Sequence, residues 1–251
     1  MARFGRIILI SFAILLSACA GRKGRTVQTE TTEEATEVQI RFMPGDTVPE
    51  TWIKDHGTES FFSVSEIPDS VFSVMAGKSF KDDCEVPRDS LRYLTCLHRN
   101  AEGLAIVGEM VLATELAEDV LGIFRELFEA DYPIEKMRLV DNWDADDDAA
   151  MLANNSSSFN YRLISRTRLI SKHGLGRAVD INPLYNPYYK MLKDSSRVIK
   201  PAGAGKYLDR SKEFPYKIVH GDLCWQLFKD KGFYWGGDWA NSKDYQHFEH
   251  N

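Results

Sequence analysis

The chain has 251 residues, of which 43% are hydrophobic and 27% are charged. This is the composition of a globular protein, and the length suits one domain or one domain with an extension. The formal net charge is −6 at pH 7, and no cluster of basic residues stands out. Both features argue against a nucleic-acid partner, because such a partner requires a basic surface.

Residues 1–18 have the pattern of a secretory signal peptide. Arg3 and Arg6 precede an apolar run at residues 7–16, which is shorter than the roughly 20 residues of a membrane-spanning helix. The sequence Leu-Ser-Ala-Cys that ends at Cys19 resembles the bacterial lipobox, where the chain is cut before the cysteine and the cysteine is lipidated. We therefore expect an exported lipoprotein held to a membrane through Cys19. Its place is the periplasmic face of the outer membrane in a Gram-negative host, and otherwise the outer face of the cell membrane. An ordinary secretory signal is the alternative.

Composition divides the rest of the chain into three parts. Residues 19–37 are rich in Thr and Glu and poor in apolar residues, which predicts a disordered tether. Residues 38–107 alternate short apolar runs with Pro, Gly and Asp, and we interpret them as an N-terminal extension packed on the main domain. That domain is predicted to occupy residues 108–251. It opens with apolar residues at helical spacing, which predict an amphipathic helix over residues 108–130.

The remaining elements are predicted from apolar runs and turn residues. A helix is expected over residues 222–231, and strands over residues 137–140, 159–164, 178–182, 233–235 and 246–249. Residues 141–155 are strongly acidic. The spacing of their aspartates is like that of a calcium loop, but the glycine and the terminal glutamate of an EF-hand are missing. A solvated loop is therefore the preferred interpretation.

Export also bears on the cysteines that follow Cys19. Cys84 and Cys96 could pair in an oxidising compartment, and the sequence leaves this open. Cys224 lies within the predicted helix and is expected to be a buried thiol. No Cys-x-x-Cys pair occurs, so a cysteine zinc cluster is not indicated.

Three residues form a candidate set of metal ligands. His173 lies in a loop with two glycines, Asp180 follows on a predicted strand, and His247 is close to the C-terminus. Catalytic zinc commonly keeps three nitrogen or oxygen ligands from the protein and leaves a fourth position for water. Histidines are more often structural or exposed than metal ligands, however, so the spacing alone does not decide between the two interpretations.

Several motifs carry a resemblance to a known family. The sequence SKHGLGRAVD at residues 171–180 matches the pattern SxHxxGxAxD of the VanY-like zinc D-alanyl-D-alanine carboxypeptidases and their L-Ala-D-Glu endopeptidase relatives, the LAS-type metallopeptidases. The sequences YWGGDW and DYQHFE near the C-terminus are similar to the second signature of that family. The stretches FNYR, which ends at Arg162, and NPLYNPYY also fit it. The resemblance extends from about residue 108 to the C-terminus.

The resemblance implies a fold and a metal centre. The fold would be α+β, with a small antiparallel sheet that carries a zinc site and helices on its outer face, as in hedgehog and D-Ala-D-Ala peptidase domains. His173, Asp180 and His247 would bind Zn²⁺. Asp244, three residues before the last ligand, would be the general base that takes a proton from the attacking water and passes it to the leaving amine.

The resemblance also suggests residues that contact the substrate. Arg162 would face the substrate carbonyl and the tetrahedral oxyanion. Ser171 would hydrogen-bond the substrate backbone or orient a ligand, and a simple turn role is the alternative. Trp239 would line the cleft, with core packing as the alternative. Glu249 is expected to pair with a cation rather than act as the base. It lies two residues after His247, on the same face of the strand, so a role in supporting that ligand stays open.

These roles together imply hydrolysis of peptide bonds in peptidoglycan stem peptides. The expected activity is that of a D-alanyl-D-alanine carboxypeptidase, which needs a cation for the terminal carboxylate. Arg166, Lys172 and Arg177 are the candidates for this cation. An L-Ala-D-Glu or cross-bridge endopeptidase is the first alternative, and a non-catalytic, zinc-stabilised wall-binding module is the second. The sequence leaves open the host envelope, the oligomeric state and the role of residues 38–107.

Overall fold

The longest strand pairing is an antiparallel hairpin of β3 (Leu91–Arg99) and β4 (Ala105–Ala113). The protein is represented by a computed structural model that describes residues 40–164 and 167–251. The predicted signal peptide, Cys19 and the tether lie outside the described residues. So does Arg166. All elements named below belong to one compact unit, Arg41–Asn251.

The hairpin forms the middle of a four-stranded antiparallel sheet in the order β1-β4-β3-β2. The two edge strands are short, β1 at Thr47–Val48 and β2 at Ser63–Ser65. The predicted boundary between residues 107 and 108 falls inside β4, so the segments on its two sides share this sheet. They also share the main hydrophobic core, which extends from Val48 to Phe248.

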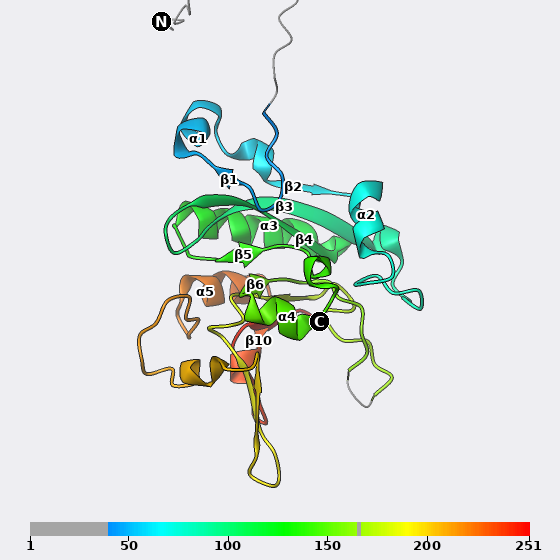
Figure 1. The fold of residues 1–251 in the computed structure, drawn as a ribbon, viewed down its shortest axis with the longest axis vertical. Coiled ribbons are helices and arrows are strands. Elements are labelled where there is room, and N and C mark those ends of the chain that lie inside the picture. The colour runs from blue at the N-terminus through cyan, green and yellow to red at the C-terminus, as the bar shows by residue number, and fades with distance from the viewer. Residues whose placement is uncertain (1–39, 165–166) are drawn as a thin grey trace, which may run out of the picture. The chain divides into compact units, whose positions relative to one another are not determined.

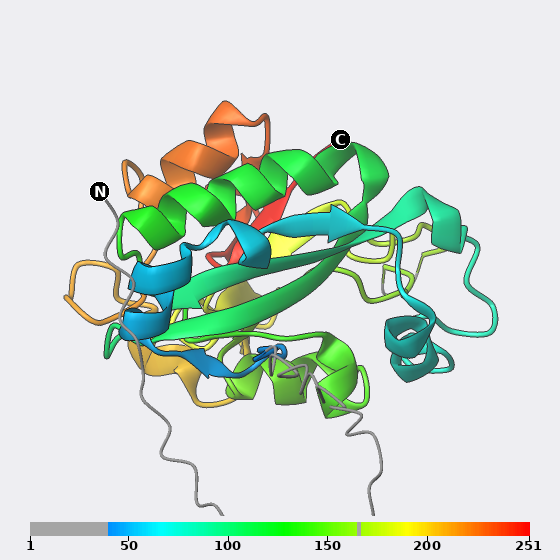
Figure 2. The ribbon, with the colours of Figure 1, turned by 90° about the horizontal axis from the view of Figure 1, so that it is seen from above.

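Helix α3 (Thr114–Glu129) follows β4 directly and covers one face of the sheet. Figure 2 shows α3 lying along the hairpin, with α5 (Leu223–Asp230) beside it. The face of α3 that packs on the sheet repeats at helical spacing and is buried at Leu116, Ala117, Val120, Leu121, Ile123, Phe124, Leu127 and Phe128. In the part of the chain that the structure describes, no helix has the length and apolar content needed to cross a bilayer.

The predicted start of this helix at residue 108 was wrong, because residues 108–113 are the end of β4. Residues 107–113 of the strand are all buried. A strand covered on both faces lacks the alternation of apolar and polar residues that marks a strand with one exposed face. Its apolar run therefore continued the apolar pattern of the helix without a visible break.

A second, smaller sheet has the order β10-β12-β7 and is antiparallel throughout. Its central strand packs against α5, where the Phe228 ring stacks on Phe248 with centroids 4.4 Å apart. The expected α+β class, with small antiparallel sheets and packed helices, is confirmed. The bounds of its strands are β7 at Ala178–Asp180, β10 at Tyr234–Trp235 and β12 at His247–Glu249.

The remaining strands form two further sheets. A three-stranded antiparallel sheet has the order β11-β8-β9, and its β8–β9 hairpin projects away from the other strands (Figure 1). β5 pairs in parallel with β6. The bounds are β5 Lys136–Met137, β6 Asn155–Ser156, β8 Tyr188–Met191, β9 Arg197–Lys200 and β11 Lys243–Asp244.

Short helices link these sheets. The α-helices are α1 (Glu50–His56), α2 (Asp69–Met75) and α4 (Asp147–Leu152). The 3-10 helices are η1 Glu59–Phe61, η2 Arg88–Ser90, η3 Val140–Trp143, η4 Ala204–Tyr207 and η5 Gly236–Asp238.

The acidic stretch at residues 141–155 is therefore not a plain loop, because it carries most of η3 and all of α4. The carboxylate of Asp146 accepts hydrogen bonds from the backbone N–H groups of Asp148 and Ala149, at 2.9 and 3.2 Å. Several of the aspartates lie at or near this helix start, where a negative side chain caps free N–H groups and meets the positive end of the helix dipole.

The strand predicted over residues 159–164 is also wrong. The backbone N–H of Phe159 donates to Val111, that of Asn160 to His173, and that of Tyr161 to Ser79. Because each amide bonds to a different segment, no ladder forms, although the backbone groups are satisfied. Residues 159–164 therefore form a connector that is hydrogen-bonded both to the loop of His173 and to β4.

Cys84, Cys96 and Cys224 are free thiols in this structure. Cys96 and Cys84 pack in two separate hydrophobic clusters, so the pairing that the sequence left open does not form. The Cys96 thiol lies 3.4 Å from the sulfur of Met137. Cys224 is fully buried within α5, as expected.

We predict that His98 makes stability depend on pH. Burial lowers the pKa of this imidazole to about 4, and its Nδ1–H donates to the carbonyl oxygen of Ile134 at 2.7 Å. In the unfolded chain the pKa is near 6.5. As the pH falls below 6.5 the unfolded state takes the proton first, so the free energy of unfolding falls until the pH reaches the folded-state pKa.

The expected loss from this one residue is about 2 kcal/mol between pH 7 and pH 5. Urea denaturation of the wild type and of His98→Gln at both pH values measures it. The drop in unfolding free energy should be smaller for His98→Gln by about that amount. Equal drops in the two proteins would contradict the prediction.

Candidate metal centre

The pairing of β7 with β12 brings two of the three candidate ligands together. Asp180 is the last residue of β7, His247 is the first of β12, and the two are direct partners in the antiparallel register. Side chains of directly opposed residues lie on the same face of a sheet. The third candidate, His173, lies in the loop that leads into β7.

The loop of His173 is held on the end of β4 by Gly176. The Gly176 carbonyl accepts a hydrogen bond from the Ala113 N–H at 2.9 Å, and the residue has a φ of +67°. A Cβ atom at this position would lie 2.7 Å from the Ala113 nitrogen. Only glycine allows both the left-handed backbone and this close approach, so the loop that carries His173 depends on it.

His173, Asp180 and His247 converge on one point. Each offers a ligand atom, and these atoms all lie within 4.8 Å of one another. His173 Nε2 lies 3.1 Å from His247 Nδ1 and 3.3 Å from Asp180 Oδ2, and His247 Nδ1 lies 3.0 Å from Asp180 Oδ1. Both histidines are buried. The spacing is that of three donor atoms around a common centre.

In each imidazole, the nitrogen that faces away from the common centre is held by a hydrogen bond. His173 Nδ1–H donates to the Ser158 carbonyl at 2.8 Å, and His247 Nε2–H donates to the Glu249 carboxylate at 3.2 Å. These bonds leave the lone pairs of His173 Nε2 and His247 Nδ1 directed at the common centre. Two lone pairs 3.1 Å apart repel each other unless a proton or a cation lies between them. The donor set therefore fits a divalent metal ion of the kind that imidazole and carboxylate bind.

The electrostatics of the three side chains favour a positive charge at this point. Burial opposes charge on His247, but its hydrogen bonds to Asp180 and Glu249 raise its pKa to about 10. Burial also opposes charge on Asp180, but the two histidines hold its pKa below the ordinary value. A metal cation would replace the proton that these groups otherwise retain.

Asp244 lies beside this set, in β11. Its Oδ1 accepts a hydrogen bond from Gln246 Nε2 at 3.0 Å. Enclosure by the protein raises the pKa of Asp244 to about 7, and Asp180 contributes to the rise, while His247 and Arg162 lower it. A carboxylate with this pKa can both accept and release a proton near neutral pH, which a general base in hydrolysis must do.

Gly236 permits the approach of Asp244 to the histidine. A Cβ atom at position 236 would lie 2.6 Å from the Asp244 carbonyl oxygen and 3.2 Å from the Cβ of His247. The backbone atom cannot move aside freely, so a side chain at this position would push Asp244 away from η5. The close approach of Asp244 to this turn therefore requires glycine at position 236.

One cleft collects the residues that the sequence proposed for metal binding and catalysis, together with Ser171 and Trp239. It has a volume of about 570 Å³, and we call it the metal-site cleft. It is lined by Arg162, Ser171, His173, Asp180, Trp239, Asp244 and His247, together with residues of α4, β8 and β9. A hollow of this size is typical of a site for a small molecule or a short peptide.

The proposed substrate-contacting residues differ in how they are held. The guanidinium of Arg162 pairs with the Asp147 carboxylate at 3.1 Å and keeps a third of its side chain exposed. The Trp239 ring lies 5.3 Å from the His247 ring between centroids. The hydroxyl of Ser171 accepts a hydrogen bond from the Gly174 N–H at 2.9 Å, which is the turn role that the sequence offered as the alternative.

Of the expected cations, only Lys172 lines the cleft among the described residues, and its ammonium donates to the His250 carbonyl at 3.0 Å. Arg177 instead pairs with Glu115 and with the backbone of Asn251. Lys200 in β9 also lines the cleft, bonded to Asp148 at 3.0 Å, and sequence reasoning missed it. Nothing in its local sequence marks it, because only the fold of the β8–β9 hairpin brings it to the cleft.

One of three comparisons with known proteins found a match. Residues 165–250 match the model of the family described as D-alanyl-D-alanine carboxypeptidase. This match supports the VanY-like peptidase family that the sequence motifs indicated. The match covers about a third of the chain and contains His173, Asp180, Asp244 and His247, whereas Arg162 precedes it. The comparisons with curated proteins and with solved structures each gave no significant match.

We predict that Glu249 supports metal binding through His247. Replacing it by alanine removes the acceptor of the His247 Nε2–H, so the ring is free to turn or to change tautomer. Zinc affinity should fall about 10- to 100-fold in Glu249→Ala, and less in Glu249→Gln, which keeps an acceptor oxygen. Competition with a chromophoric chelator measures the affinity.

Glu59→Ala is the matched control, because Glu59 is also paired, with Arg125 at 2.7 Å, but is largely exposed. Its zinc affinity should equal that of the wild type. The supporting role of Glu249 is wrong if the two alanine variants bind zinc equally well.

Proposed function

We propose that this protein is a zinc-dependent peptidase that hydrolyses peptide bonds in peptidoglycan stem peptides, acting as a D-alanyl-D-alanine carboxypeptidase. The observation that carries the proposal is the convergence of His173, Asp180 and His247 beside Asp244 in one cleft. The family of residues 165–250 agrees with peptidase activity.

His173 Nε2, His247 Nδ1 and a carboxylate oxygen of Asp180 would hold the zinc ion. When bound there, zinc supplies Lewis-acid chemistry, which polarises a carbonyl and makes water more acidic. The protein contributes the fixed orientation of the three donors through Ser158 and Glu249. It also contributes an enclosed site, where electrostatic interactions are stronger than in water.

Asp244 would move the proton. Its carboxylate accepts a proton from the attacking water and delivers it to the nitrogen of the leaving amine, so the bond between carbonyl carbon and nitrogen breaks with the charges balanced. Arg162 would donate hydrogen bonds to the oxyanion that forms at the attacked carbonyl. Its pairing with Asp147 holds the guanidinium in the cleft before the substrate arrives.

A carboxypeptidase must also recognise the terminal carboxylate of its substrate. Lys200 is suited to this role, because its only ion-pair partner among the described residues is Asp148 and both side chains are about half exposed. An exposed pair of this kind contributes little to stability, so a substrate carboxylate can replace Asp148 at low cost. The lysine therefore favours the carboxypeptidase over an endopeptidase that cuts inside the stem.

Export and anchoring through lipidated Cys19 would place this activity where its substrate lies. Peptidoglycan is outside the cytoplasm, and the tether at residues 19–37 would give the catalytic unit reach from the membrane. Export and lipid anchoring are therefore included in the proposed function.

Removing the proposed base should abolish catalysis but not metal binding. Asp244→Ala should lower kcat about 10²- to 10⁴-fold against a pentapeptide stem, with zinc affinity close to that of the wild type. Asp238→Ala is the control, because Asp238 belongs to the same turn region but pairs with His220 at 2.7 Å outside the cleft. If the wild type hydrolyses no stem peptide with zinc present, and Asp244→Ala binds wall fragments as well as the wild type does, the protein is a binding module.

The products identify the bond that is cut. We expect mass spectrometry of digested muropeptides to show free D-alanine and a stem shortened by one residue. Lys200→Ala should raise KM for the pentapeptide about tenfold through loss of the carboxylate contact. Internal fragments without free D-alanine would establish an endopeptidase instead.

A further inference from the structure

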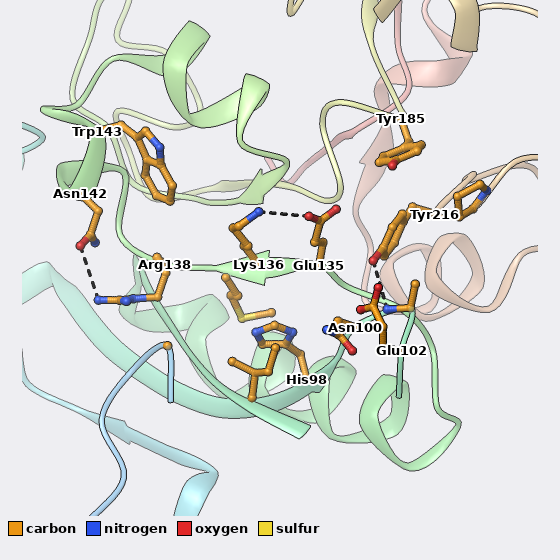
Figure 3. Close-up of a pocket in the computed structure, with 15 residues that line it drawn as sticks. His98, Asn100, Glu102, Glu135, Lys136, Arg138, Asn142, Trp143, Tyr185 and Tyr216 are labelled. Atoms are coloured by element: carbon orange, nitrogen blue, oxygen red, sulfur yellow. Dashed lines mark hydrogen bonds and ion pairs between the residues drawn. The ribbon is translucent and has the colours of Figure 1, made fainter. Parts of the chain in front are cut away.

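A second pocket lies along β5, apart from the proposed catalytic residues (Figure 3). We call it the β5 pocket. It has a volume of about 770 Å³, which exceeds that of the metal-site cleft. His98, Ile106 and Met137 line it together with polar and aromatic side chains. The proposed chemistry uses none of the residues that line this pocket.

Three of the four charged side chains that line the β5 pocket are paired within the protein. Lys136 Nζ bonds to Glu135 Oε1 at 3.1 Å, and Arg138 Nε bonds to the buried Glu109 at 2.8 Å. Glu102 and Glu135 balance Lys136 and Arg138, so the lining has no net charge while His98 is neutral. A strongly charged ligand would find no surplus of opposite charge there, which favours an uncharged polar ligand.

Aromatic rings stand at both ends of the pocket. Trp143 is at one end, and Tyr185 and Tyr216 are at the other, with the Lys136–Glu135 pair between them (Figure 3). Trp143 and Tyr185 are partly exposed. Tyr216 is anchored, because its hydroxyl accepts a hydrogen bond from the Ala101 N–H at 3.0 Å. Such rings offer flat apolar faces beside hydrogen-bonding groups, and this combination suits the faces and hydroxyl groups of sugar rings.

The β5 pocket and the metal-site cleft are lined in part by two elements that contact each other, η3 and α4. Asn142 and Trp143 of η3 line the pocket, whereas Asp147 and Ala150 of α4 line the cleft. The two elements are connected by only a few residues. A ligand made of a glycan with a peptide attached could therefore place its sugars in the pocket and its peptide in the cleft.

We propose that the β5 pocket binds the uncharged amino-sugar units of a glycan strand, next to the cleft that takes the attached peptide. This deepens the proposed function and rests on it for the identity of the glycan. The sugar would contact Trp143 and Tyr185 through its faces, and Asn100 and Glu135 lie where its hydroxyl and acetamido groups can bond.

The test is a titration of the full chain with the β-1,4-linked tetramer of N-acetylglucosamine, which carries no peptide and no charge. Isothermal titration calorimetry should show binding that weakens at least about tenfold in Trp143→Ala and in Tyr185→Ala. Tyr234→Ala is the matched control, because Tyr234 is 59% exposed in β10 and lines neither the pocket nor the cleft. Its affinity should equal that of the wild type.

A second readout compares kcat/KM for a stem peptide on its glycan with kcat/KM for the free stem peptide. This ratio should fall in Trp143→Ala and stay constant in Tyr234→Ala. Absence of tetramer binding, or equal binding by all variants, overturns the proposal even if stem peptides are hydrolysed. Tetramer binding without any hydrolysis instead leaves the β5 pocket in place and removes the proposed peptidase function.

Discussion

The whole site depends on the pairing of two very short strands. β7 and β12 place Asp180 opposite His247, and each strand has only three residues. A shift of one residue in this register would turn His247 to the other face of the sheet, away from His173. The register is held by the packing around it, in particular by Val179 and Phe248, which are direct partners and lie in the main core. Burial of these apolar neighbours therefore fixes the geometry of the polar site.

The larger sheet gives the site its support. Gly176 attaches the loop of His173 to the last residue of β4, and Phe159 attaches the connector before it to the same strand. The long β3–β4 hairpin thus acts as a rigid base on which the loops of the site are fixed. Residues before position 108 belong to that base, since β3 and part of β4 come from them. A fragment that starts at residue 108 would lack the partner strand of β4.

Sequence reasoning located the candidate site more easily than the secondary-structure elements. His173, Asp180, Asp244 and His247 were marked by motifs with fixed spacing, and such motifs persist because the chemistry needs those side chains. The start of α3 and the connector at residues 159–164 were misjudged, because each depends on tertiary contacts that no local pattern shows. Lys200 was missed for the same reason. Glu249 was only an open option, since a hydrogen bond to His247 cannot be inferred from a spacing of two residues.

The most direct test of the central claim is the zinc content of the purified chain after dialysis, measured by mass spectrometry for the wild type and for His173→Ala. We expect about one zinc ion per wild-type chain and little zinc in the variant, because loss of one of three protein ligands leaves too few donors for tight binding. A wild type without zinc, or a variant that retains as much zinc as the wild type, would contradict the proposed centre.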